Sequence, residues 1–196
     1  TQTLTSFNIP ALNEIEDFRV NKNHTISAIE MPNLQSAFNT VDANINIFNN
    51  DNLNTISFPV LSQFGSIDIK QNRSLSTIDF SSLENIISFD ISANEVLSSL
   101  DASAVINMGS IHINSNLALT SIDFSNVETL NSIQISDNNS LETFTFPKIT
   151  EIGNYIVPDG SDISIIIEEG GLAASLLSIN NNDKLLSFEM PLLTSI

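Results

Sequence analysis

The stretch Ile133-Gln-Ile135-Ser-Asp-Asn138-Asn-Ser-Leu141 is one copy of a unit that recurs every 22 residues. Between residues 53 and 141 the spacing never slips, as its leucine column shows: Leu53, Leu75, Leu97, Leu119 and Leu141. A fixed period of this length is typical of a solenoid, in which each unit forms one coil and stacks on its neighbours. The sequence therefore predicts a repeat architecture before any single residue is interpreted.

Spacing within the unit predicts the shape of one coil. The pairs Ile67/Ile69 and Ile78/Phe80 alternate in the manner of strands with one buried face, and Leu83 to Ile86 predicts a third, extended side. No segment holds the i, i+3, i+4, i+7 pattern of a helix. We therefore expect an all-β fold, a right-handed parallel β-solenoid with 22-residue turns, because parallel crossovers are almost always right-handed.

The register predicts a single solenoid domain, 1–196, of about eight to nine rungs. The second unit is five residues too long, which predicts a loop near 38–44. Residues 154–175 fit the pattern loosely and are interpreted as a degenerate rung, because Leu141 and Leu185 lie 44 residues, or two periods, apart. The start at Thr1, without an initiator Met, indicates a processed chain or a segment of a longer one.

One column of the repeat holds asparagine, three residues after the paired apolar positions. An amide there can donate to and accept from the backbone at a tight corner, and stacked Asn ladders stabilise parallel β-structure. Three of these residues begin glycosylation sequons (Asn23, Asn72 and Asn138), but ladder amides should point inward, so modification is not expected. The predicted ladder is Asn23, Asn50, Asn72, Asn94, Asn116, Asn138 and Asn182.

The complete unit reads I-x-I-x-x-N-x-x-L-x-x-I-x-F, which resembles the leucine-rich-repeat core L-x-x-L-x-L-x-x-N-x-L. The runs 58–72 and 135–141 look more closely like the receptor L-domain family, β-helical relatives of leucine-rich repeats found in growth-factor receptors and in fungal and bacterial surface proteins. The resemblance covers nearly all of the chain. It implies ligand binding or adhesion in an extracellular or cell-surface protein, and it transfers no binding residue.

Composition narrows the possible partners. Six Lys and Arg residues against 23 Asp and Glu give a formal charge of −17, which argues against nucleic acid and anionic membranes, because phosphate contacts need basic residues. The chain has no cysteine, so disulfides and Cys-based zinc sites are excluded. No apolar run is long enough to span a bilayer, so membrane insertion is not expected.

The outward positions of the first strand carry mixed polar residues, the variety that a specific recognition surface would show. In leucine-rich repeats this is the face that contacts partners. We expect a protein or glycan ligand here, with the 38–44 loop extending the surface, and no catalytic residue. The predicted ligand-binding face is Arg19, Asn46, Asp68, Asp90, His112 and Gln134.

The outward positions of the second strand suggest two alternatives, and the ends of the stack suggest a third. Asp79, Asp101 and Asp123 fall on successive rungs and could form a Ca²⁺ site of a carbohydrate-active β-helix enzyme, although a solvated acidic face explains them as well. The neighbouring hydroxyl column suggests an ice-binding surface. Exposed parallel edges at the two ends suggest end-to-end self-association into fibres. No other cofactor is expected, and a non-catalytic binding or adhesion module is the preferred interpretation. The hydroxyl column is Ser6, Thr55, Thr77, Ser99, Ser121, Thr143 and Ser187, with Ala28 among them.

Overall fold

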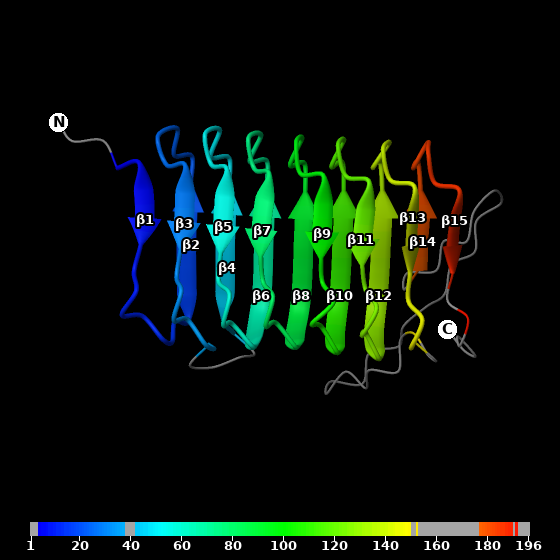
Figure 1. The fold of residues 1–196 in the computed structure, drawn as a ribbon, viewed down its shortest axis with the longest axis horizontal. Coiled ribbons are helices and arrows are strands. Elements are labelled where there is room, and N and C mark those ends of the chain that lie inside the picture. Colours follow the sequence, from blue (N-terminus) through cyan, green and yellow to red (C-terminus); the bar gives the residue numbers. More distant parts are fainter. Residues whose placement is uncertain (1–3, 38–41, 150–151, 153–176, 190, 192–196) are drawn as a thin grey trace.

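The computed structural model describes residues 4–37, 42–149, 152, 177–189 and 191. These residues contain only strands and turns (Figure 1), so the predicted all-β class is confirmed. The strands are β1 (Ser6–Asn8), β2 (Asp17–Asn21), β3 (Ala28–Glu30), β4 (Asn44–Phe48), β5 (Thr55–Ser57), β6 (Gln63–Lys70), β7 (Thr77–Asp79), β8 (Asn85–Ser92), β9 (Ser99–Asp101), β10 (Asn107–Asn114), β11 (Ser121–Asp123), β12 (Thr129–Ser136), β13 (Thr143–Thr145), β14 (Leu177–Asn180) and β15 (Ser187–Glu189).

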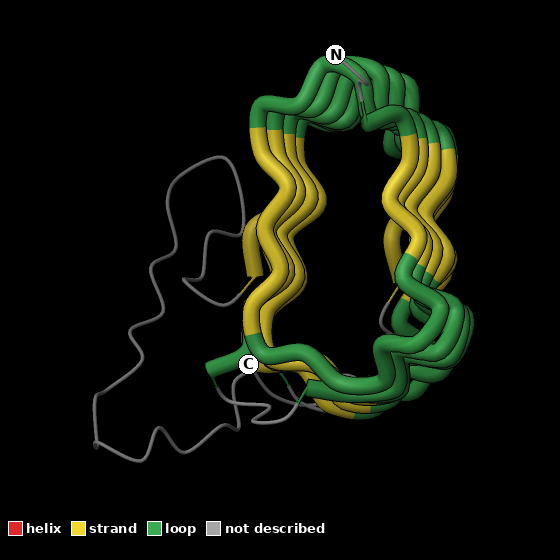
Figure 2. The backbone as a smooth tube through the Cα atoms, turned by 90° about the vertical axis from the view of Figure 1, so that its left-hand side faces the viewer, coloured by secondary structure: helices red, strands yellow, loops and turns green. Residues whose placement is uncertain are grey.

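The described strands form a parallel β-solenoid with two facing walls (Figure 2). One wall is a seven-stranded sheet in the order β2-β4-β6-β8-β10-β12-β14, here called the long sheet. The other wall consists of two four-stranded sheets, β1-β3-β5-β7 and β9-β11-β13-β15. Every strand pair is parallel, and from β4 to β12 the long-sheet strands pair at the 22-residue period of the repeat, as in Asp68↔Asp90 and Asp90↔His112. The predicted solenoid is therefore confirmed.

The C-terminal rung stacks differently from the expected order. β14 pairs directly with β12, with Ile135 opposite Ile179, and β15 pairs directly with β13. The segment 154–175, which the sequence assigns to a degenerate rung, lies outside the described residues. In the described chain, Ile152 forms a parallel bridge with Leu130, 22 residues earlier, so the rung that follows β12 starts on the normal period and resumes at Leu177 in β14.

In the eight-residue strands β6, β8, β10 and β12, the third side of the coil is continuous with the long sheet. In β8 the side chains of Ile86 and Phe89 are buried and Ile87 is exposed, so the inward and outward alternation breaks where the strand bends. Gly109 occupies the position of Ile87 one rung later, where a Cβ would lie 2.2 Å from the carbonyl oxygen of Ile87. The sequence predicted a separate extended side, but the structure joins it to the strand.

Apolar columns fill the interior between the walls. Ile67, Ile69 and Leu75 are fully buried, and in the phenylalanine column the rings of Phe124 and Phe146 stack with their centroids 4.4 Å apart. A column of prolines lies just past the short strands. Pro59 follows β5 in a turn closed by the Leu61 N–H on the Phe58 carbonyl (3.1 Å), where its fixed φ is favourable. Ser81 takes the equivalent place in the next turn.

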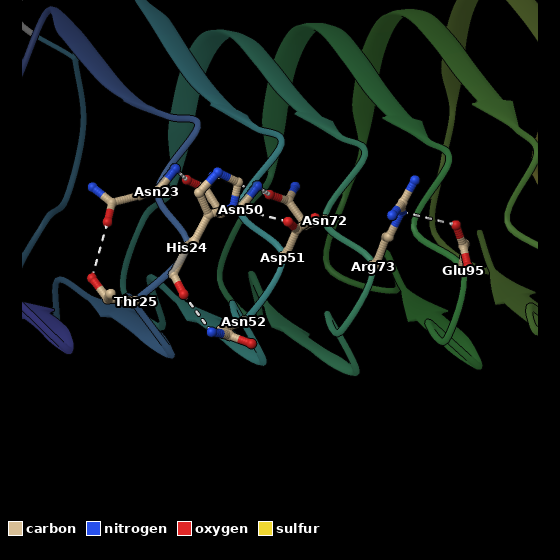
Figure 3. Close-up of polar contacts among 9 residues, drawn as sticks. All are labelled: Asn23, His24, Thr25, Asn50, Asp51, Asn52, Asn72, Arg73 and Glu95. Atoms are coloured by element: carbon tan, nitrogen blue, oxygen red, sulfur yellow. Dashed lines mark hydrogen bonds and ion pairs between the residues drawn. The ribbon is translucent and has the colours of Figure 1, made fainter.

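The asparagine column forms the predicted ladder at one corner (Figure 3). The side-chain oxygen of Asn94 accepts the backbone N–H of Asn72 (3.1 Å), and its amide nitrogen donates to the Ile69 carbonyl (2.9 Å). The same pair of bonds recurs at Asn72, Asn116 and Asn138. Each buried asparagine therefore ties its own rung to the backbone of the rung before it.

The residue before each ladder asparagine has a left-handed backbone. Its φ lies between 50° and 58° in every described rung, and no glycine occupies the column. An L-residue in this region costs roughly 1–2 kcal/mol. The hydrogen bonds of the adjacent asparagine offset this strain. The left-handed residue turns the backbone so that the asparagine side chain reaches the previous rung. The column is Lys22, Asn49, Gln71, Ala93, Ser115, Asp137 and Asn181.

Replacing one ladder residue tests this account. Asn94→Ala leaves the Asn72 N–H and the Ile69 carbonyl in the interior without these side-chain partners, each at a cost of about 1–3 kcal/mol. We expect the free energy of unfolding, measured in urea, to fall by about 3 kcal/mol. The matched change Asn107→Ala, at an exposed position of β10, should cost less than about 1 kcal/mol. Equal losses in the two variants would contradict the ladder's structural role.

Candidate binding surface

The predicted ligand-binding residues lie in one row across the long sheet. Register pairs Arg19 with Asn46, Asp68 with Asp90, and His112 with Gln134, with the intervening pairs also in register. Their neighbours along each strand are buried, so the row faces outward. We call this row, with the outward residues beside it, the long-sheet face. The sequence placed these residues on one face correctly; whether they bind a ligand stays a prediction.

Four ionisable residues form a cluster at the centre of this face. The Lys70 ammonium lies 2.8 Å from an oxygen of Asp90 and 3.4 Å from an oxygen of Asp68. His112 Nδ1 lies 3.7 Å from Asp90, and the Ser92 hydroxyl donates to the other Asp90 oxygen. The Asp90 side chain is only 15% exposed. Asp90 is therefore a half-buried centre surrounded by donors from three strands.

These contacts change the acidity of the cluster. Burial alone would raise the pKa of Asp90, but the nearby His112 ring, the close contacts with Lys70 and Ser92, and the charge of Lys70 lower that pKa to about 2. Burial would likewise lower the pKa of Lys70, and its contacts with Asp90 and Asp68 raise it instead. Both groups are therefore held in their charged forms at neutral pH.

The two ends of the row stand apart from the cluster. Arg19 is exposed and pairs with Asp17 of its own strand at 3.2 Å, and Gln134 is exposed on β12. The loop predicted at 38–44 ends earlier than expected, because Asn44 already belongs to β4. Residues 38–41 lie outside the described residues, so the proposed extension of the surface over this loop stays a prediction.

Sequence reasoning missed several residues of this face. Lys70 and Ser92 lie two residues after Asp68 and Asp90, so strand alternation would have placed them beside the row. A column of half-buried serines, Ser66, Ser88, Ser110 and Ser132, runs along the other side of the row. The 22-residue period would have found this column too.

Phe48 is the most unusual residue missed. It lies on β4 between buried Ile47 and the corner, on the outward side of the strand, and stays partly exposed outside the core. Its neighbour across the strands is Lys70, whose ammonium is bound to Asp90 and Asp68. An aromatic ring is thus presented beside the charged cluster.

The aspartate row on the short strands bonds to the turns that follow these strands. Oδ1 of Asp79, Asp101 and Asp123 each accepts the backbone N–H two residues later, at 3.1, 2.9 and 2.8 Å. The Ser103 hydroxyl and then its N–H lower the pKa of Asp101. These carboxylates therefore cap turns. No group of three or more His, Cys, Asp or Glu side chains that could hold a metal ion occurs in the described part of the chain; whether the row binds Ca²⁺ stays a prediction.

An open hollow of about 460 Å³ lies over the same wall. It is bordered by Asp101 and Asp123 on one side and by the hydroxyls of Ser99, Ser121 and Thr143 on the other. The hydroxyls of neighbouring strands are in register. The column exists as predicted, and ice binding stays a prediction.

Comparison with known proteins adds no relative. No family model, no curated protein and no solved structure matches the chain. No helix capable of crossing a bilayer occurs among the residues that the structure describes.

The Asp90 contacts predict how stability depends on pH. Because the pKa of folded Asp90 lies near 2, below its ordinary value of 3.8, its charged form stabilises the fold above about pH 4, and this contribution is lost as pH falls to about 2. Asp90→Asn should remove about 1–2 kcal/mol at pH 7, after allowance for solvent screening, and flatten the slope of unfolding free energy between pH 4 and 2. Urea unfolding across this range measures both effects.

Gln134→Ala, at a neutral position of the same row, is the control and should leave that slope unchanged. An unaltered slope in Asp90→Asn would show that the contacts of His112, Lys70 and Ser92 do not hold the carboxylate charged.

Proposed function

We propose that this chain is a non-catalytic binding or adhesion module, of the receptor L-domain type, that recognises a protein or glycan through its long-sheet face. We place it at a cell surface or outside the cell, as the resemblance to that family implies. The proposal is supported by one observation above others: chemically different side chains are held in register on adjacent strands of one sheet.

Rigidity supports this role. The side chains of the face stand on strands that are tied to their neighbours by backbone pairing and by buried asparagines at the corner. A surface ordered before binding loses less conformational freedom when the ligand docks. The half-buried Asp90, held by neighbours on three strands, has little freedom left to lose.

The chemistry of the face suggests how a ligand would be held. Phe48 offers a partly exposed ring, and aromatic residues often carry much of the energy of an interface. The serine column and Asn46 provide donors and acceptors for a polar partner. Because Lys70 already pairs with Asp68 and Asp90 and the chain carries a charge of −17, we expect a neutral or cationic ligand.

A paired set of variants tests the proposal. Asp68→Asn, Asp90→Asn and His112→Gln together alter the charged cluster while keeping similar shapes. The control set, Thr77→Ala, Ser99→Ala and Ser121→Ala, changes three exposed hydroxyls on the opposite wall. Wild-type protein and both sets are applied to arrays of extracellular protein domains and of neutral and amino-sugar oligosaccharides.

We expect the cluster variant to lose at least tenfold in affinity for any ligand of the wild type, and the control to bind within twofold. A thermal melt of each variant checks that it is folded. If the cluster variant still binds the ligand and the control variant does not, the ligand binds the opposite wall and the proposal is wrong.

A further inference from the structure

The asparagines of the three glycosylation sequons lie in different surroundings in the structure. Asn72 and Asn138 are fully buried. Their amide nitrogens, the atoms that would carry a sugar, donate to the carbonyls of Ile47 (2.9 Å) and Ile113 (2.7 Å). A glycan on either nitrogen would have to occupy the interior of the solenoid, so the folded chain excludes both sites.

Asn23 belongs to the same column and is its first member, so no ladder asparagine precedes it. It is tied to the next rung by its backbone N–H, which donates to Asn50 Oδ1 at 2.9 Å. Its own Oδ1 accepts the Thr25 hydroxyl (3.3 Å), and its amide nitrogen has no acceptor among the described residues. In Figure 3 this nitrogen points away from Asn50, toward the N-terminal end of the stack. Asn23 is partly exposed, and His24 and Thr25 are exposed.

We propose that Asn23, in the sequon Asn23-His24-Thr25, is an N-glycosylation site and that the other two sequons stay unmodified in the folded protein. The donor would be a lipid-pyrophosphate-linked oligosaccharide. The amide nitrogen forms a bond to the anomeric carbon and loses one proton, and the bond from that carbon to the pyrophosphate oxygen breaks as lipid pyrophosphate leaves. This goes beyond ligand binding, and the site lies at the corner rather than on the long-sheet face.

The ladder tolerates this modification at its first position only. At the other positions the asparagine side chain bonds to the backbone of the rung before it, whereas the link that the structure gives Asn23 to another rung is its backbone N–H, which a side-chain glycan leaves unchanged. The modified residue would lie beside the unpaired edge of β2, which has one neighbour, β4, in the described long sheet. A glycan there would hinder the pairing of another strand at this edge.

Secretion from a eukaryotic cell line tests the proposal directly. The full chain is expressed behind a cleavable leader, and folded, secreted monomer is analysed by glycosidase treatment in ¹⁸O water and peptide mass spectrometry. We expect one glycan per chain, at Asn23. Thr25→Ala should abolish it, and Ser74→Ala and Ser140→Ala, which remove the other two sequons, should leave it unchanged. Folded protein without sugar at Asn23, or with sugar at Asn72 or Asn138, overturns the proposal.

A second measurement does not depend on the host. In ¹⁵N-labelled bacterial protein, the side-chain amide protons of Asn23 should exchange with water at least a hundredfold faster than those of Asn72 and Asn138. Equal protection of the three amides would show that the Asn23 nitrogen is as enclosed as the others, and the proposal would fail.

Discussion

The fold depends on the bridge that each buried asparagine makes between two rungs. Asn50, Asn72, Asn94, Asn116 and Asn138 are fully buried, and a polar group in that position is costly unless its bonding capacity is used. Here the side-chain oxygen accepts from one backbone N–H and the nitrogen donates to one backbone carbonyl of the preceding rung. Backbone groups at a tight corner, which no strand ladder can reach, are thereby satisfied without water.

The same bridge fixes the geometry of the surface. It sets each corner at one height, so the strands on both sides of the corner keep the same register along the stack and their outward side chains form straight columns. The cluster of Lys70, Asp90 and His112 arises because three successive rungs place their residues one strand spacing apart. A slip of one residue would bury these charges and expose the apolar columns. A rigid interior thus positions a chemically varied exterior.

Much of this could be predicted from the sequence, because a strict period reveals which residues share a column. The solenoid, the asparagine ladder and the row through Asp90 all follow from counting. Features that depend on the path of the backbone could not be predicted from the spacing of the residues. Ala93 gives no sign of a positive φ, and Asp101 gives no sign that its carboxylate caps a turn. The direct stacking of β14 on β12 also escaped, because a spacing of 44 residues is equally consistent with an intervening rung.

Native-state hydrogen exchange of the backbone amides of Asn50, Asn72, Asn94 and Asn116 tests the central claim most directly. These N–H groups lie at corners, where exchange is normally fast, but each donates to a buried side chain of the next rung. The account predicts that these amides exchange only when the long-sheet strands open, so that their opening free energy equals that of the strand amides. Exchange at the rate of the exposed turn residues would contradict it, because the asparagines would then not hold the rungs together.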